Sequence, residues 1–347
     1  MPQQTVLRFP TRTTFSDLTS NLEEIPHLRS HEVLIKVRAI SLNSRDCQIA
    51  SSNYPFPIKD NVIPGSDAAG DVVAVGDAVR DLAEGDRVVV CFDQERPYGP
   101  ARDAVAFQNG GGLDGVMARY IVRAATAVVK VPAGAVQSYS ELAALTCTGV
   151  TAWNALYGNT QLVPGQVVLV QGTGGTAMTA LVLAKAAGAV TIVTSSSDSK
   201  LAAVKARFNP DHCINYTKTP DWAAEALRLT NGKGVDHIIE IGGTGTIEQS
   251  IAAIKRGGVI SIIGYLAKYD PAKVPNILLL ALCKEAVLRG LQVGPRCMLE
   301  DLVEFVSRKG LRFAIDREFR FSREEVVAAY EALDSGKHVG KICIVVE

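Results

Sequence analysis

The spacing of apolar residues changes along the chain and predicts two kinds of structure. Residues 32–40 (EVLIKVRAI) alternate apolar and polar positions, and the stretches AAGDVVAVGDAV and GDRVVVCF add short valine-rich runs separated by glycine. Alternation of this kind between turn residues is typical of half-buried β-strands. We therefore expect an antiparallel sheet or barrel in the first part of the chain.

From about residue 140, short apolar runs alternate with longer alanine-rich segments. The runs include QVVLVQG, VTIVTS, VDHIIEI and VISIIGY, and the segments between them include TAMTALVLAKAAGA, SKLAAVKARF and IEQSIAAIKRGG. This alternation predicts βαβ units on a parallel sheet. After about residue 311 a β-like stretch, a helix in SREEVVAAYEALDSG and a last strand in KICIVVE follow, and this portion could return to the first domain.

Composition and charge narrow the classes of protein. The chain has 347 residues, 47% of them hydrophobic, which is enough for two domains. Its 36 basic and 36 acidic residues cancel without a block of like charge, so we expect neither a nucleic-acid nor a membrane partner. The N-terminus lacks the apolar core of a signal peptide and the run VPNILLLALC (274–283) is too short to cross a bilayer, so we expect a cytoplasmic protein. The seven cysteines are scattered without a C-x-x-C pair and indicate reduced core thiols.

The stretch QGTGGTA (171–177) follows an apolar run and precedes a helix-like segment. Gly172, Gly174 and Ala177 have the G-x-G-x-x-A spacing that permits a tight turn, admits a pyrophosphate and lets helix and strand pack closely. Glycine also occurs in such turns for steric reasons alone, but the strand before it and the helix after it favour a cofactor cradle. We predict that the cradle consists of Gly172, Gly174, Gly175, Thr176 and Ala177.

The end of the next predicted strand, VTSSSDSK, indicates which dinucleotide the cradle binds. Ser195, Ser196 and Lys200 offer hydroxyls and an ammonium, which suit a 2′-phosphate, so NADP(H) is favoured over NAD. The alternative is that these serines only cap the next helix. Asp198 could accept from a ribose hydroxyl, and it keeps NAD as a minority interpretation.

These motifs resemble those of the medium-chain dehydrogenase/reductase superfamily, in its zinc-independent, quinone oxidoreductase-like or enoyl reductase-like branch. The similar stretches cover nearly the whole chain and include SLNSRDCQIA, IPGSDAAGDVVAVGDAV, EGDRV, LTCTGVTAWNAL, VLVQGTGGTA, GGVISIIG and HVGKICIV. The resemblance implies an α/β protein with a GroES-like β-rich catalytic domain (1–130 and 312–347) and a Rossmann domain with a doubly wound parallel sheet (131–311). It also implies an active site in the cleft between them.

Zinc-dependent relatives hold their catalytic metal with a thiolate, an imidazole and a further thiolate or carboxylate. At the corresponding places this chain has Asn43, Ser66 and Ala144, which cannot form such a set. The four closely spaced cysteines of a structural zinc lobe are replaced by a stretch with Cys91 alone, and the five histidines form no cluster. Cys47 and Cys147 have no partner at ligand spacing and are interpreted as buried thiols. We therefore expect no zinc.

The resemblance implies further contacts to the cofactor. Tyr216, in INY, would help Ser195 and Lys200 to hold the 2′-phosphate, although a role as core filler stays open. Thr148, in TCTGVTA, resembles a threonine on the nicotinamide side. Gly264, in IIGY, resembles the glycine where the edge of the sheet meets the cofactor.

Without zinc as a Lewis acid, an alcohol has no obvious activator, so reduction of an already polarised acceptor is favoured. The predicted activity is transfer of hydride from NADPH to a quinone, an α,β-unsaturated carbonyl or an enoyl group. Asn43 is the first candidate to hydrogen-bond the oxygen that gains charge, unless it only holds a backbone turn. Tyr54, in SSNYPFP, is a second candidate as substrate wall or proton donor, unless it is a plain loop aromatic.

The sequence does not specify the small-molecule substrate, because the loops that would form its pocket, 51–62 and 92–114, follow no readable code. Two other functions stay open: one biosynthetic step by carbonyl reduction or cyclisation, and non-catalytic NADPH binding. AVLRGLQVG (286–294) resembles the edge strand through which relatives pair, so we expect a homodimer. The run at 274–283 would line the cleft or cover that interface.

Overall fold

A computed structural model describes residues 2–103 and 105–347. It divides into two compact units, which we call unit 1 (Met1–Val150 and Val293–Glu347) and unit 2 (Thr151–Gln292). Residues 131–150 and 293–311, which the sequence assigned to the Rossmann domain, lie in unit 1. Helices α2 (Tyr139–Ala143) and α9 (Arg296–Lys309) belong to unit 1 because they contact its strands.

Unit 1 is built on a sheet with the strand order β14-β15-β3-β4-β5-β7, and β6 pairs with β3 beside this path. A separate antiparallel pair is formed by β1 and β2. The strands are β1 (Gln3–Arg8), β2 (Thr19–Glu24), β3 (Glu32–Ser41), β4 (Asp67–Val75), β5 (Arg87–Val90), β6 (Tyr120–Ala124), β7 (Val128–Lys130), β14 (Ile315–Arg320) and β15 (Lys341–Val345). The remaining helices are α1 (Ser44–Ala50) and α10 (Arg323–Asp334), with a π-helical turn at Leu145–Gly149 and 3-10 turns at Phe15–Asp17 and Ala125–Ala127.

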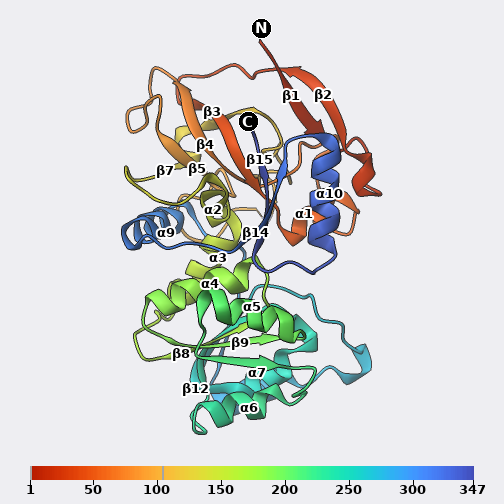
Figure 1. The fold of residues 1–347 in the computed structure, drawn as a ribbon, viewed down its shortest axis with the longest axis vertical. Helices are drawn as coiled ribbons and strands as arrows, with labels where there is room; N and C mark the ends of the chain where they lie inside the picture. Colours follow the sequence, from red (N-terminus) through yellow and green to blue (C-terminus); the bar gives the residue numbers. More distant parts are fainter. Residues whose placement is uncertain (1, 104) are drawn as a thin grey trace. The chain divides into compact units, whose positions relative to one another are not determined.

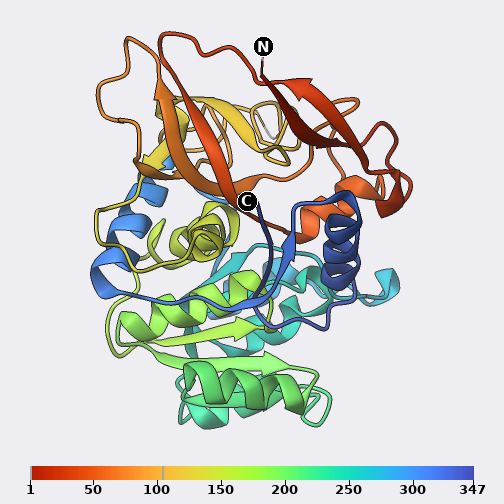
Figure 2. The same cartoon turned by 45° about the horizontal axis from the view of Figure 1, so that its top comes forward.

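The alternating pattern of the sequence is visible in β3, where Val33, Ile35 and Val37 are fully buried and the residues between them are half-buried. These side chains join the core of unit 1, to which β15 and α10 also contribute. The C-terminal strands therefore return to the first domain. β14 and β15 pair in parallel rather than antiparallel, because α10 connects them. This helix lies beside α1 in both views (Figures 1 and 2).

Unit 2 contains a parallel sheet with the strand order β10-β9-β8-β11-β12-β13. The strands are β8 (Val167–Gln171), β9 (Val190–Ser195), β10 (His212–Asn215), β11 (Val235–Glu240), β12 (Ile254–Ile262) and β13 (Val287–Gly290). The helices are α3 (Val150–Tyr157), α4 (Gly175–Ala186), α5 (Asp198–Phe208), α6 (Trp222–Leu229), α7 (Ile247–Ala253) and α8 (Ile277–Lys284), with 3-10 turns at Gly243–Gly245 and Pro271–Lys273. The strand order steps outward in both directions from β8, which is the doubly wound arrangement.

The central strands of unit 2 are buried on both faces. Val168, Leu169 and Val170 of β8 are inaccessible to solvent, as helices on both faces of a parallel sheet require. The predicted combination of a β-rich domain and a doubly wound parallel α/β domain is confirmed. No helix of the described residues is long and apolar enough to span a membrane.

Candidate active site

The turn QGTGGTA joins the end of β8 to the start of α4. Gly172 has a positive φ of +78°, a backbone conformation that favours glycine, and Gly174 is the extended N-cap residue of α4. A Cβ atom built on either glycine would meet nothing within 4 Å. The space in front of this helix N-terminus is therefore kept open by the absence of side chains.

The first turn of α4 directs backbone donors into this space. The N–H of Met178 is the first to bond within the helix, to the carbonyl of Gly174 at 3.0 Å. The N–H groups of Gly175, Thr176 and Ala177 precede it and have no acceptor within the helix. Ala177 is fully buried, as close packing of helix and strand requires. Open space, free amides and the positive end of the helix dipole fit the pyrophosphate of a dinucleotide.

Ser195, Ser196 and Tyr216 lie together where β9 and β10 end. The two strands are parallel with Asn215 opposite Ser195, and the N–H of Tyr216 donates to the carbonyl of Ser195 at 3.0 Å. Tyr216 is 43% exposed, which does not fit a core filler. Ser196 is exposed, and Lys200 is half-buried in the first turn of α5.

A different serine caps the helix that follows. The Oγ of Ser197 accepts from the N–H of Lys200, so Ser197 is the N-cap residue of α5, and the Oγ of Ser195 accepts from the N–H of Ser197 at 3.3 Å. The carboxylate of Asp198 faces its neighbours: Asn215 Nδ2 and Lys218 Nζ each donate to it over 2.6 Å. Sequence reasoning missed Lys218, which adds a second cation to this edge, because nothing in its pattern separates it from an ordinary surface lysine.

A buried carboxylate secures the loops at the carboxyl edge of the unit 2 sheet. Glu240, at the end of β11, is inaccessible to solvent and accepts from Gln171 Nε2 at 2.7 Å and Thr246 Oγ1 at 2.5 Å. Further donors are Ser250 Oγ and the N–H groups of Gly242 and Gly243. A Cβ at Gly264 would lie 2.6 Å from the carbonyl of Ile241, so close backbone contact requires glycine there. The only indication of this role in the sequence was the position of Glu240, a charged residue at the end of the apolar run VDHIIEI.

In unit 1, Asn43 lies in a buried chain of hydrogen bonds. Lys341, the first residue of β15, is 4% exposed and its Nζ donates to Asn43 Oδ1 at 2.6 Å and to the carbonyl of Leu42. The Nδ2 of Asn43 donates to Ser66 Oγ at 3.3 Å, and Ser66 Oγ donates to Asp67 Oδ1 at 2.6 Å. An ammonium has no acceptor, so Lys341 fixes the orientation of the Asn43 amide.

The pKa of Asp67 depends on its burial and on its neighbours in this cluster. Burial raises the pKa of Asp67 to about 6, against the opposing effect of the Lys341 charge. Hydrogen bonds from Ser66 and Asn43 also lower that pKa. Sequence reasoning missed Lys341 and Asp67, although both lie in the motifs HVGKICIV and IPGSDAAG, because it did not foresee that they would be buried together.

Asn43 also has the backbone role that the sequence left open. It is the N-cap residue of α1, and its N–H donates to the carboxylate of Asp46 at 2.7 Å. Burial raises the pKa of Asp46. The backbone of Asn43 thus holds the turn between β3 and α1, while its side chain belongs to the Lys341 chain.

The helical segment after α2 approaches the same cluster. The N–H of Cys147 donates to Asp67 Oδ2 at 3.3 Å, and Thr148 Oγ1 donates to the carbonyl of Ala144 at 2.9 Å. Burial raises the pKa of the Cys147 thiol well above its usual range. Tyr54 is half-exposed on loop 51–62, and its ring centre lies 5.3 Å from the guanidinium carbon of Arg45.

The residues at the places of the zinc ligands do not fit a zinc ion. The Oδ1 of Asn43 is occupied by an ammonium, the Ser66 hydroxyl donates to a carboxylate, and Ala144 has no donor atom in its side chain. Among residues 2–103 and 105–347, no group of three or more His, Cys, Asp or Glu side chains could hold a metal ion.

Two protein-family models match the chain. The family model for the alcohol dehydrogenase GroES-like domain matches residues 29–133, and that for zinc-binding dehydrogenase matches residues 175–308. A zinc-type alcohol dehydrogenase-like protein of Schizosaccharomyces pombe is 41% identical over 96% of each chain.

Solved structures with the same fold include two informative cases. The structure of a putative alcohol dehydrogenase from Sinorhizobium meliloti 1021 has a TM-score of 0.89 and 35% identity, covering 99% of this chain and all of that one. The quinone oxidoreductase from Coxiella burnetii has a TM-score of 0.76 and 26% identity over the full length of both chains. The chain therefore belongs to the medium-chain dehydrogenase/reductase superfamily. It is an oxidoreductase of that type, and the family binds a nicotinamide cofactor.

Proposed function

We propose that the protein is an NADPH-dependent, zinc-independent reductase of a small activated acceptor: a quinone, an α,β-unsaturated carbonyl or an enoyl group. The observation that carries the proposal is the Lys341–Asn43–Ser66–Asp67 chain, in which amide, hydroxyl and ammonium groups occupy the places of a metal-binding set. The matched family and the Schizosaccharomyces pombe relative are named after zinc, so zinc independence is a proposal about this chain.

NADPH, when bound, supplies the hydride, and the acceptor takes one proton from solvent. The chain's own share is to orient the acceptor and to hydrogen-bond the oxygen that gains charge. Asn43 is our candidate for this donor, because Lys341 holds its Oδ1 and its Nδ2 carries a second hydrogen besides the one that it donates to Ser66. Tyr54 is our candidate for a wall of the acceptor pocket.

The preference for NADPH rests on the end of β9. Ser195, Ser196 and Tyr216 lie where β9 and β10 end, and Lys200 follows in the first turn of α5. Asp198 is paired with Lys218 rather than open to a ribose hydroxyl. Thr148, on the nicotinamide side, and Gly264, at the sheet edge, complete the proposed cofactor contacts.

Replacing Lys200 with alanine should weaken NADPH binding by about tenfold or more and leave NADH binding nearly unchanged. Only NADPH has a 2′-phosphate, and the variant would lose the proposed contact between that phosphate and Lys200. Fluorescence titration with both nucleotides measures this. The matched control is Lys205→Ala, on the same helix and exposed. Equal losses for both nucleotides in Lys200→Ala would contradict the 2′-phosphate assignment.

Two alternatives are separated from this proposal by activity. A protein dedicated to one biosynthetic reduction or cyclisation would bind NADPH but turn over no generic quinone or enone. A non-catalytic NADPH-binding protein would bind NADPH but would not oxidise it, whichever acceptor is added. The free state of the cysteines supports a reducing compartment, and we propose a cytoplasmic location.

We also propose that the protein is a homodimer through unit 2. β13 is the edge strand of the sheet, and Leu278, Leu282 and Val287 are exposed on it and on α8 before it. An apolar patch beside an unpaired strand edge favours pairing with a second copy.

Replacing Leu282, which is 74% exposed, with glutamate should convert the dimer to a monomer, because a charge would then be buried in the interface. Light scattering after size exclusion measures the mass. Leu22→Glu, in unit 1 at 70% exposure, is the control that should stay dimeric. A monomeric wild-type protein would contradict the homodimer.

A further inference from the structure

Loops 51–62 and 92–114 of unit 1 are bonded to each other. The N–H of Lys59, in the first loop, donates to the carbonyl of Gly111, in the second, at 3.0 Å. Tyr54 lies on the first loop, and residue 104 of the second loop lies outside the described residues. Two charged side chains make further contacts between the loops, one from helix α1 and one from the second loop itself.

Arg45 of α1 makes the first set of contacts. It is 8% exposed, and its guanidinium carbon lies 5.3 Å from the ring centre of Tyr54 in the first loop and 4.9 Å from that of Phe92 in the second. Its NH1 donates to the carbonyl of Asn109 at 3.0 Å, and its NH2 donates to Gln108 Oε1 at 3.4 Å. One guanidinium therefore contacts both loops.

The charge of Arg45 is balanced only by a long ion pair. Its NH1 lies 3.9 Å from Oδ1 of Asp46, beyond hydrogen-bond distance. A buried guanidinium has lost its hydration, so the two rings and the loop oxygens must compensate for it. A planar guanidinium can stack on a ring and donate along its edge at the same time, and an ammonium cannot. The geometry is thus specific to arginine.

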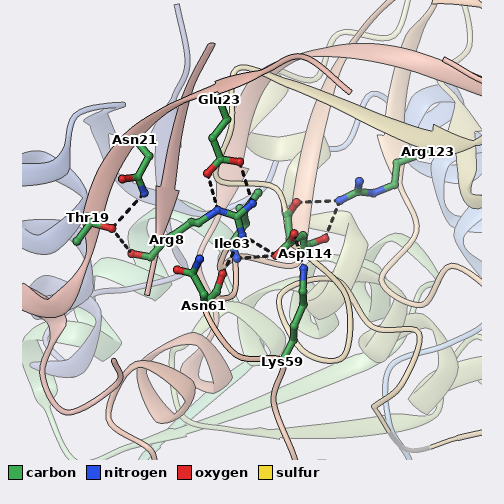
Figure 3. A network of polar contacts seen from close by, with 10 residues as sticks. Arg8, Thr19, Asn21, Glu23, Lys59, Asn61, Ile63, Asp114 and Arg123 are labelled. Carbon is green, nitrogen blue, oxygen red and sulfur yellow. Dashed lines mark hydrogen bonds and ion pairs between the residues drawn. The ribbon is translucent and has the colours of Figure 1, made fainter. Parts of the chain in front are cut away.

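Asp114, at the end of the second loop, makes the other set of contacts (Figure 3). Its Oδ2 accepts from Lys59 Nζ at 2.6 Å, and its Oδ1 accepts from the N–H of Ile63 at 2.9 Å and from Arg8 NH1 at 3.1 Å. Arg8 NH1 also donates to the carbonyl of Asn61 at 2.8 Å. The carboxylate therefore binds the first loop directly through Lys59 and indirectly through Arg8.

The network around Asp114 is itself anchored. Glu23 of β2 binds Arg8 in a two-pronged ion pair with distances of 2.5 and 2.8 Å, and Arg123 NH2 donates to the carbonyls of Asp114 and Gly115 (Figure 3). Burial raises the pKa of Asp114, but the hydrogen bonds from Ile63 and Lys59 outweigh it and hold that pKa below its usual range. Asp114 is thus ionised at neutral pH.

We propose that Arg45 and Asp114 are positioning residues that lock loops 51–62 and 92–114 into one preformed wall of the acceptor pocket. The inference rests on the proposed function, because it takes Tyr54 as part of that wall. A wall that is already ordered does not lose conformational freedom when the acceptor binds, so the lock lowers the cost of binding. The two residues act on the acceptor and not on the cofactor, whose phosphate contacts lie in unit 2.

Hydrogen exchange of the full-length protein tests the lock without any substrate. Arg45→Lys and Asp114→Asn should each raise the exchange rate about tenfold in peptides from 51–62 and 105–114, and should leave β3 and β15 unchanged. The matched controls repeat the same chemistry elsewhere in unit 1. Arg87→Lys changes a guanidinium that stacks on Tyr139 and donates to two carbonyls, and Asp86→Asn changes a carboxylate bound to Lys130 and to a backbone N–H.

The same variants are then assayed for turnover and NADPH binding. We expect the KM for a quinone or enone to rise about tenfold in Arg45→Lys and Asp114→Asn, with the Kd for NADPH unchanged. The lock would be overturned if hydrogen exchange in both loops were unchanged in Arg45→Lys and Asp114→Asn. It would also be overturned if exchange became faster throughout unit 1, or if the same two loops exchanged faster in the control variants. Faster loop exchange with an unchanged acceptor KM would overturn the positioning role. If the wild-type protein turns over no acceptor but the two variants show faster exchange in the loops, the proposed function is contradicted. The lock itself is then still supported.

Discussion

Replacing Gly174 with valine is expected to abolish the binding of both NADPH and NADH while the protein stays folded. The φ of Gly174 is −76°, which any residue adopts, and a Cβ there meets no atom within 4 Å. The new side chain would therefore fill only the open space in front of the α4 N-terminus, where we expect the pyrophosphate. We expect affinity for both nucleotides to fall at least about 100-fold and the free energy of unfolding to fall by no more than about 1 kcal/mol.

Fluorescence titration and urea unfolding measure the two quantities. Gly290→Val is the matched control, since a Cβ at Gly290 also meets nothing within 4 Å and the residue lies on β13, away from the turn. It should bind both nucleotides normally. Normal binding by Gly174→Val would mean that QGTGGTA is only a turn.

The second large effect is expected from replacing Lys341 with methionine. The methionine has a similar length but no charge, so it leaves Asn43 Oδ1 without its donor and Asp67 without its nearby cation. Breaking a buried charge pair typically costs about 3 kcal/mol of stability. We expect loss of that order in urea unfolding at about pH 8, together with loss of acceptor reduction and unchanged NADPH binding.

The loss of stability in Lys341→Met should depend on pH through the ionisation of Asp67. The pKa of Asp67 is about 6 in the folded protein, above its ordinary value of 3.8. Stability associated with Asp67 is therefore fully present below the ordinary pKa and is lost as the pH rises through about 6. Lys341 lowers this pKa, so its removal raises the pKa further and increases the loss at high pH. The difference between Lys341→Met and wild type should shrink at about pH 5, where Asp67 can be neutral.

The control for the Lys341 prediction is the double variant Lys341→Met/Asp67→Asn. It removes both charges, so it should be more stable than Lys341→Met at about pH 8. A destabilisation of Lys341→Met that does not change with pH, or that Asp67→Asn does not relieve, would show that Lys341 acts by packing alone.

The sequence predicted the elements whose pattern is local. Alternation in EVLIKVRAI specified β3, and the strand, glycine turn and helix around QGTGGTA specified β8 and α4, because each depends only on neighbouring residues. The return of the C-terminal strands to unit 1 was also foreseen. The borders of the two units differ from the predicted domain borders, because α2 and α9 pack against strands that lie far away along the chain.

The candidate site was predictable to the extent that it follows motifs. The cradle residues lie at the turn from β8 to α4, and Ser195, Ser196 and Tyr216 lie where β9 and β10 end, but their contacts to a cofactor stay predictions. Lys341, Asp67 and Arg45 were missed as members of clusters, because a charged residue in a sequence is ordinarily exposed and only the fold brings these three into its interior. The roles of Asn43 and Tyr54 stay predictions.

NADPH oxidation by the purified, chelator-treated and metal-analysed protein, with a panel of quinones, enones and enoyl thioesters, tests zinc-independent reduction most directly. We expect oxidation of NADPH with at least one acceptor, faster than with NADH, at a rate that added zinc does not change. Oxidation that disappears with the metal and returns with zinc would contradict zinc-independent reduction, and so would a protein that reduces none of these acceptors.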